Sequence, residues 1–347
     1  MFRLLLLFTL LQASLIINSQ EATSQQERKF ENVVVLSGEK VKIPETLFIP
    51  TAIYTVDDKL LVIDDGGDYY FHLYSYPKIE NIELFGRKGE GPDEIKFNPQ
   101  LSFMDKQFID FFDFRNNSLF EINTGCRNNN GNNNKCIRLL QVLPTELTNP
   151  QNVIKIDDTI IAGFGVNGGK IFFYNTKTKQ PKFISLPFET FNIKEQDKNI
   201  IYNGYMACSS DKSFIVFASL YFDCYMMFDN NGNILLNNYK REISNLFFSK
   251  GRVTTDNTKL YYTSVFATEK YFYLLYVGGR STNELMREID NNTFKCEIQK
   301  YSQNGLPVSA YIINKPVTSF CVSEEFKDII TIDPASEDAP IVRFGYK

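Results

Sequence analysis

The stretch "ELFGRKGEGPDEIKF" at residues 83–97 places three glycines around an Arg-Lys pair. Glycine-rich loops bind phosphate when they lead into a helix whose N-terminal amides face the anion. Here the next apolar run, "QLSFMD", reads as a strand, and no Gly-Lys-Ser/Thr ending is present. The sequence therefore favours a connection between two sheets over a phosphate loop. Four charged residues remain as a candidate ligand-binding cluster: Arg87, Lys88, Asp93 and Glu94.

A second candidate site is the turn "DDGGD" at residues 64–68. Asp64 and Asp68 bracket it, and carboxylate oxygens are ligands that calcium prefers. The turn lacks the spacing of an EF-hand loop and its final Glu. A turn between two strands also needs no ligand, so we interpret it mainly as a turn.

Three asparagines recur in the similar segments "FNPQL", "TNPQN" and "YNGYM". Their amide oxygens, arranged as a ring, suit a cation or a polar ligand. Asn-Pro and Asn-Gly pairs also form turns without any ligand, and this second interpretation is preferred. The candidates are Asn98, Asn149 and Asn203.

The chain has a single histidine, His72. Zinc sites, Ser-His-Asp triads, polysaccharide lyases and quinone-dependent dehydrogenases are therefore disfavoured, because most of these depend on histidine. His72 lies inside the apolar run "YYFHLYSY", which predicts a packed or surface residue.

The composition favours an all-β protein that does not bind nucleic acid. The 347 residues include 31 Phe and 19 Tyr but no Trp, and aromatic residues suit the half-buried surface of a sheet. The formal net charge is -4, with no clustered basic face of the kind that nucleic acid requires.

The first residues predict export. Arg3 precedes an apolar run over residues 4–17, and a polar stretch follows. This pattern is typical of a signal peptide, which we place at residues 1–20 with an uncertain boundary. No cysteine near the end of the run supplies a lipobox, and no later segment reads as a membrane span. We expect a periplasmic or extracellular protein.

Six cysteines in an oxidising compartment permit disulfides. Cys126 and Cys136 bracket the polar loop "RNNNGNNNK", so we predict that they pair. The other four have no metal-like spacing and are either buried thiols or further bridges: Cys208, Cys224, Cys296 and Cys321.

An internal repeat organises these residues. An acidic residue in a turn between two apolar runs recurs every 48–58 residues, at Asp57, Asp105, Asp157, Asp211, Glu269 and Glu324. Each interval holds about four short strands, as a propeller blade does. The sequence therefore predicts one six-bladed β-propeller of four-stranded antiparallel blades over residues 30–347.

The last blade lacks one strand, since only two apolar runs follow Glu324. The N-terminal segment "FENVVVLSGEKVKI" at residues 30–43 can supply it. Such a strand would close the ring and remove an exposed sheet edge.

The segments "YTVDDKLLVID" and "FGRKGEGPDEI" resemble those of TolB-like six-bladed propeller proteins exported by Bacteroides-type bacteria. The second is similar to a Gly-x-Gly-Pro-Gly-Glu-Phe-like signature between the first two blades of that family. Asp93 stands where Gly is common, and Ile95 replaces the aromatic residue. The resemblance implies an exported propeller. Many members are lipoproteins, and this chain lacks the lipobox cysteine.

Propeller geometry places the candidate residues on one face. With strands a to d numbered from the axis outward, the b–c loop and the connection from strand d to the next strand a share a face, here called the b–c face. The turns "DDGGD" and "GRKGEGPDE" both belong to it.

The absence of a strong catalytic constellation favours an exported, non-enzymatic binding or scaffold protein. Its partner would be a polysaccharide, a peptide or a protein, and no cofactor is expected. The alternative is a calcium-dependent, lactonase-like hydrolase with its metal in the axial channel.

Overall fold

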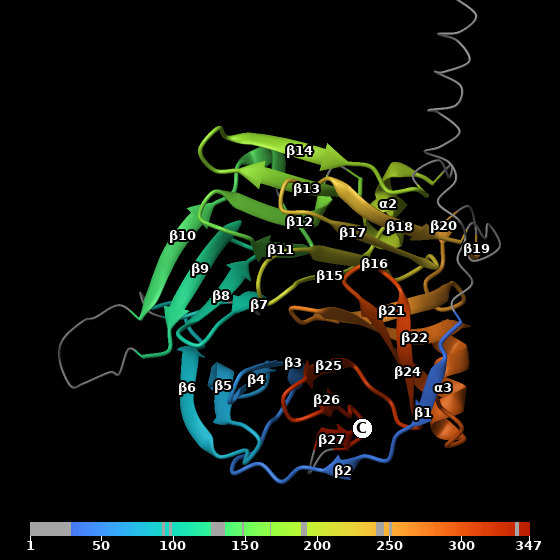
Figure 1. Cartoon of the computed structure of the whole chain (residues 1–347). Coiled ribbons are helices and arrows are strands. Elements are labelled where there is room, and N and C mark those ends of the chain that lie inside the picture. Colours follow the sequence, from blue (N-terminus) through green and yellow to red (C-terminus); the bar gives the residue numbers. More distant parts are fainter. Residues whose placement is uncertain are drawn as a thin grey trace, which may run out of the picture.

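The computed structural model describes residues 29–91, 94–96, 99–125, 136–147, 149–166, 168–188, 193–240, 246–249, 252–336 and 340–347. Within these ranges the chain forms six main sheets arranged as a ring (Figure 1). The innermost strands lie near the middle of the picture, and the outermost strands lie at the rim. The predicted six-bladed β-propeller is confirmed.

The first three blades each contain four consecutive antiparallel strands. Blade one consists of β3 (Pro50–Val56), β4 (Lys59–Asp64), β5 (Tyr69–Ser75) and β6 (Asn81–Arg87). Blade two consists of β7 (Gln100–Met104), β8 (Phe108–Asp113), β9 (Ser118–Asn123) and β10 (Ile137–Val142). Blade three consists of β11 (Asn152–Lys155), β12 (Ile160–Val166), β13 (Lys170–Asn175) and β14 (Gln180–Ile184).

The last three blades include two strands from the N-terminal part of the chain. Blade four consists of β15 (Gly204–Cys208), β16 (Ile215–Ser219), β17 (Cys224–Phe228) and β18 (Ile234–Tyr239). Blade five consists of β21 (Lys259–Ala267), β22 (Tyr271–Ser281), β23 (Cys296–Ser302), β24 (Pro307–Ile313) and β1 (Asn32–Val35). Blade six consists of β25 (Ser319–Ser323), β26 (Asp328–Ile332), β27 (Ile341–Gly345) and β2 (Glu39–Lys40).

Short elements decorate the connections between the strands. They are the 3-10 helix η1 (Thr145–Leu147), the helices α2 (Glu195–Ile201) and α3 (Thr282–Asp290), and the ribbon of β19 (Phe248–Ser249) with β20 (Arg252–Val253). Arg252 fastens the ribbon to α2, because its Nη2 lies 2.7 Å from the buried Asp197 Oδ1. A capping box between Ser281 and Glu284 begins α3.

The ring closes through the N-terminal segment, as predicted, but that segment serves two blades. β2 pairs antiparallel with β27 and supplies the outer strand of blade six, with Glu39 opposite Arg343. The preceding β1 pairs parallel with β24 and extends blade five. Gly38 lies between the two strands, and a Cβ there would come within 2.6 Å of the side chains of Phe344 and Val342. Only glycine allows so close an approach.

The repeated acids mark the a–b turns of all six blades, and in several blades their role is local. Asp105 Oδ1 accepts hydrogen bonds from the backbone N–H groups of Gln107 and Phe108, at 2.8 and 2.7 Å. Asp157 does the same for Thr159 and Ile160, at 2.6 and 2.8 Å. In these blades the acid accepts hydrogen bonds from backbone N–H groups of the tight turn, which explains why an acid recurs at this position.

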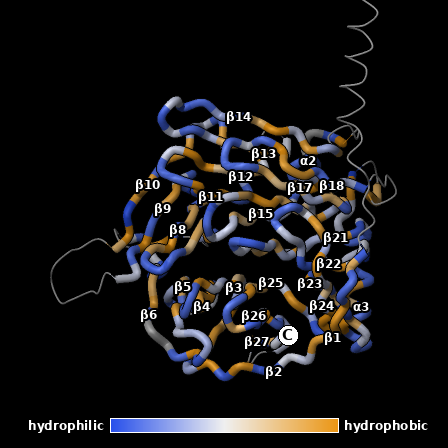
Figure 2. The backbone as a smooth tube through the Cα atoms, in the orientation of Figure 1, coloured by the Kyte–Doolittle hydropathy of each residue, from blue (hydrophilic) through white to orange (hydrophobic). Residues whose placement is uncertain are grey.

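Polar side chains on the innermost strands link neighbouring blades. Ser319 Oγ accepts a hydrogen bond from Ile53 N–H, and Ser102 Oγ accepts one from Lys155 N–H, at 3.3 and 3.0 Å. Asn152 Oδ1 accepts one from Met206 N–H at 2.9 Å. Farther from the axis the blades pack through buried aromatic and branched residues, while hydrophilic residues gather in the turns (Figure 2).

Candidate functional site

The backbone confirms that the two predicted loops share the b–c face. The N–H of Lys88, at the end of strand d of blade one, donates to the carbonyl of Asp68 in the b–c loop at 2.8 Å. On the opposite face of blade two, Thr124 N–H donates to the Gln107 carbonyl at 2.8 Å, which joins the c–d and a–b turns. The "DDGGD" turn and the glycine-rich connection are therefore direct neighbours.

The glycine-rich connection is a self-satisfied loop. Gly91 N–H donates to Glu94 Oε2 at 2.9 Å, and Gly89 N–H donates to the Ile95 carbonyl at 3.2 Å. Ile95 N–H donates to the Arg87 carbonyl at 2.8 Å. These amides already have acceptors, so they do not form a phosphate cradle. Asp93 lies outside the described residues.

The side chains of Arg87 and Lys88 lie in different environments. The Arg87 side chain is 66 % exposed, and its Nε lies 3.9 Å from Glu94 Oε1. The Lys88 ammonium lies 4.6 Å from the centre of the Tyr70 ring, in a cation–π arrangement. Its Nζ is buried and has no hydrogen-bond partner among the described residues. Sequence reasoning selected both cations but gave no indication of the Tyr70 contact.

The two acids of the "DDGGD" turn have different roles. Asp64 is fully buried, and its Oδ1 accepts from Ile49 and Gly66 N–H at 2.7 and 2.9 Å. Its Oδ2 accepts from Phe48 N–H at 2.9 Å. Asp68 is exposed on the b–c face. Asp64 therefore holds the backbone that leads into blade one, and of these two acids only Asp68 faces solvent.

The asparagines act as turn residues where the structure describes them. Asn149 is exposed and adopts a left-handed backbone with φ of 56°, which asparagine tolerates well. Asn203 Oδ1 accepts from the N–H of Gly204 at 2.7 Å. Asn98 lies outside the described residues. Among the described residues, no group of three His, Cys, Asp or Glu side chains is placed to hold a metal ion.

His72 is buried within blade one, which is the packed alternative of the two that the sequence left open. Its Nδ1 lies 2.8 Å from Glu45 Oε1, and its Nε2 lies 3.2 Å from the Tyr69 carbonyl. Glu45 Oε1 also accepts a hydrogen bond from the Tyr74 hydroxyl at 2.6 Å. The histidine thus ties the N-terminal segment to strand c of blade one.

Four cysteines are free thiols. Cys224, Cys296 and Cys321 are buried, and Cys208 is partly buried. Burial raises the pKa of the Cys208 and Cys296 thiols to about 12, so both are protonated and unreactive at neutral pH. Cys126 lies outside the described residues, so its pairing with Cys136 stays a prediction.

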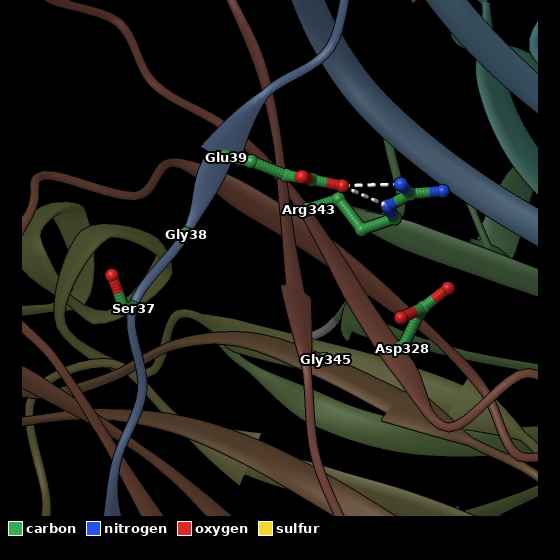
Figure 3. Close-up of a pocket in the computed structure, with 6 residues that line it drawn as sticks. All are labelled: Ser37, Gly38, Glu39, Asp328, Arg343 and Gly345. Carbon is green, nitrogen blue, oxygen red and sulfur yellow. Dashed lines mark hydrogen bonds and ion pairs between the residues drawn. The ribbon is translucent and has the colours of Figure 1, made fainter.

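A polar recess of about 530 Å³ lies beside the closure of the ring, where β2 pairs with β27 (Figure 3). Its charged residues are already engaged. The Arg343 guanidinium points toward Glu39 and donates from Nε to Glu39 Oε1 at 2.8 Å. Asp328 Oδ2 accepts from the Tyr76 hydroxyl of blade one at 2.6 Å. We interpret the recess as part of the closure, on the face opposite Arg87.

Blade two carries a charged ladder that the sequence analysis missed. Asp110, Glu121 and Arg138 lie opposite one another on strands b, c and d. Arg138 Nη2 is 2.8 Å from Glu121 Oε1, and Lys155 Nζ of blade three is 4.0 Å from Asp110 Oδ2. Burial raises the pKa of Asp110 to about 6. The available signal was the isolated charges within the apolar strands "FIDFFD", "SLFEIN" and "IRLLQV".

Comparison with known proteins places the chain in a family. A ring of six blades, each with four antiparallel strands and blade five with the additional strand β1, defines it as a six-bladed propeller protein. Residues 28–325 match the TolB-like 6-blade propeller-like family, and the chain belongs to that family. The family resemblance predicted from the sequence is confirmed. Among curated proteins, no sequence matches this chain.

Two solved structures from Bacteroides are similar in fold. One is a member of the DUF4221 family from Bacteroides vulgatus, with 12% identity and a TM-score of 0.54 over 90% of this chain and 98% of that one. The other, from Bacteroides fragilis, is described as exported and has 10% identity and a TM-score of 0.53 over the same shares. Within the described residues, no helix is long and apolar enough to cross a membrane.

Proposed function

We propose that this chain is an exported, non-enzymatic binding protein that recognises a carboxylate-bearing partner on the b–c face of its propeller. Arg87 and Lys88 would make the principal contacts, with Asp68 beside them. The loop that carries the two cations is held by its own backbone hydrogen bonds, so little ordering entropy would be lost on binding.

The observation that carries the proposal is the Lys88 ammonium. It offers three hydrogen-bond donors, yet its buried Nζ has no acceptor among the described residues. A buried donor without an acceptor costs about 1–3 kcal/mol, and more when charged. An anionic group on this face would supply the acceptor once the Lys88 side chain turns outward from its buried position. The neighbouring Arg87 is exposed and suited to bind a carboxylate through its guanidinium fork.

Export is supported by two observations. The first 20 residues have the pattern of a signal peptide, although they lie outside the described residues. A structurally similar protein from Bacteroides fragilis is described as exported. A cell-surface or periplasmic location would bring the b–c face into contact with acidic polysaccharides or peptides.

Binding of two polyanions and one neutral polymer tests the proposal. Polygalacturonate and poly-L-glutamate both present carboxylates, while dextran presents none. We expect binding to at least one polyanion, weakening as the salt concentration rises, and no binding to dextran. Arg87→Ala combined with Lys88→Ala should weaken binding at least tenfold.

Arg138→Ala is the matched control, because the Arg138 side chain is similarly exposed, at 67 %, but lies on the rim of blade two. An equal loss of affinity in the double variant and in Arg138→Ala would mean that any surface cation is enough to bind the polyanion. Unchanged affinity in the double variant would show that the site lies elsewhere.

A further inference from the structure

The outer strand of each blade ends a sheet within the described part of the chain, and five of the six carry a feature that discourages further pairing. Charges, prolines and bulges all serve this purpose. β6 and β10 have charged residues and a break in register, and β18 has a break in register. β14 contains Pro181 and Lys182, and β2 consists only of Glu39 and Lys40.

β1 is the exception. Its sequence, Asn-Val-Val-Val, has no charge and no proline, and it pairs with β24 in one continuous register. β-branched residues also favour the extended conformation. Val33 and Val35 are 57 % and 63 % exposed. The strand therefore combines an open edge with exposed apolar side chains.

The direction of the backbone groups at this edge follows from a neighbouring bond. Leu36 N–H donates to the Ile312 carbonyl of β24 at 3.0 Å. Alternate residues of a strand direct their N–H groups to the same side. Val34 therefore faces β24 with its N–H, while Val33 and Val35 direct theirs to the open edge.

We propose that two copies of this chain form a dimer by antiparallel pairing of their β1 strands. A two-fold axis through Val34 would place Val33 of each copy opposite Val35 of the other. These are the residues whose backbone groups face the edge, so each pair exchanges two hydrogen bonds. The valine side chains of the two copies then meet on one surface of a continuous sheet.

A second copy is the best partner because the edge matches itself. Asn32 to Leu36 contain no charge, so no repulsion opposes the symmetric register. An isologous contact of this kind closes on itself and does not form fibres. Four hydrogen bonds and four valines form a small interface, so we expect a dissociation constant of roughly 10–100 μM.

Sedimentation velocity of the exported chain over a range of concentrations tests the dimer. The wild type should pass from monomer to dimer as the concentration rises. Val35→Pro removes an N–H from the open edge without touching the bonds to β24, and proline is tolerated on edge strands. It should raise the dissociation constant at least tenfold while the melting temperature changes little. Val33→Lys should also raise the dissociation constant at least tenfold, because it places a charge on the apolar edge.

Leu235→Lys is the matched control, since Leu235 on β18 has the same exposure as Val33, 57 %. It should leave the dimer intact. A chain that remains monomeric up to several hundred micromolar would overturn the proposal, as would dimers that survive Val35→Pro or dissociate with Leu235→Lys. Monomers at every concentration would also be the outcome if another segment or protein covered β1.

Discussion

Asp64 Oδ1 accepts a hydrogen bond from the backbone N–H of Ile49 at 2.7 Å, which ties the end of strand b of blade one to the segment that leads into the propeller. Two further N–H groups donate to the same carboxylate. Asp64→Ala would leave these donors without their acceptor. We expect it to lower the free energy of unfolding by about 2–4 kcal/mol, measured by chemical denaturation.

Asp68→Ala is the control for this change, because Asp68 lies in the same turn but is exposed. It should alter the unfolding free energy by less than about 0.5 kcal/mol. Equal effects of the two substitutions would contradict the structural role assigned to Asp64.

Closure of the ring depends on Gly38, where a Cβ would come within 2.6 Å of Phe344 and Val342 side-chain atoms. Gly38→Val should therefore destabilise the protein by about 1–3 kcal/mol through overpacking. Gly67→Ala is the comparison, since its Cβ would meet nothing closer than 3.6 Å. Thermal unfolding should separate the two variants, and identical melting temperatures would count against the closure.

Deletion of residues 30–43 removes both β1 and β2. Blade six would lose its outer strand and expose the edge of β27. We expect the melting temperature to fall by roughly 10 °C or more. An unchanged melting temperature would show that the ring holds without its N-terminal strands.

The raised pKa of Asp110 predicts a pH dependence of stability. Burial raises this pKa from 3.8 to about 6, so the folded chain holds a proton that the unfolded chain releases. The contribution of Asp110 to stability is therefore full below pH 3.8 and is lost as the pH rises through about 6. Asp110→Asn stays neutral throughout. It should be more stable than the wild type by about 1–3 kcal/mol at pH 8, with the difference vanishing near pH 4.

Denaturation of both proteins across that pH range measures the difference directly. Glu121→Gln is a useful comparison, because Glu121 lies on the same ladder and pairs with Arg138. A less stable Asp110→Asn at pH 8 would mean that attraction to Lys155 outweighs the cost of burying the charge.

Cysteine pairing gives a chemical prediction. Peptide mapping without reduction should find Cys126 joined to Cys136, and the four remaining cysteines as free thiols. The thiols should react with an alkylating reagent only after unfolding, since three of them are buried and burial raises the pKa of the fourth, Cys208, to about 12. A bridge between Cys126 and any other cysteine would refute the pairing.

Local signals made the architecture predictable. At Asp105 and Asp157 the acid of the a–b turn accepts hydrogen bonds from backbone N–H groups two or three residues away, so the neighbouring sequence is enough to indicate its role. The apolar segments that form strands and the hairpin turns between them are also encoded by neighbouring residues. The shared face of the two loops followed from that repeat, and the family followed from the resemblance of residues 54–64 and 85–95 to the TolB-like proteins.

Long-range contacts were not predictable in the same way. Asn32 pairs with Ser309, and the sequence did not indicate that one segment would serve two blades. Asp64 was a candidate ligand, but its oxygens face amides more than ten residues earlier in the chain. The contact of Lys88, which directly follows β6, with Tyr70 on β5 also depends on side chains whose direction the sequence does not reveal.

Hydrogen–deuterium exchange with a bound polyanion tests the central claim most directly. With polygalacturonate or poly-L-glutamate present, we expect slower exchange in residues 65–68 and 86–91, on the b–c face. The opposite face offers an internal reference in the a–b turns around Asp105 and Glu324, where exchange should not change. Protection of those turns, with none at residues 65–68 and 86–91, would contradict a binding site at Arg87 and Lys88.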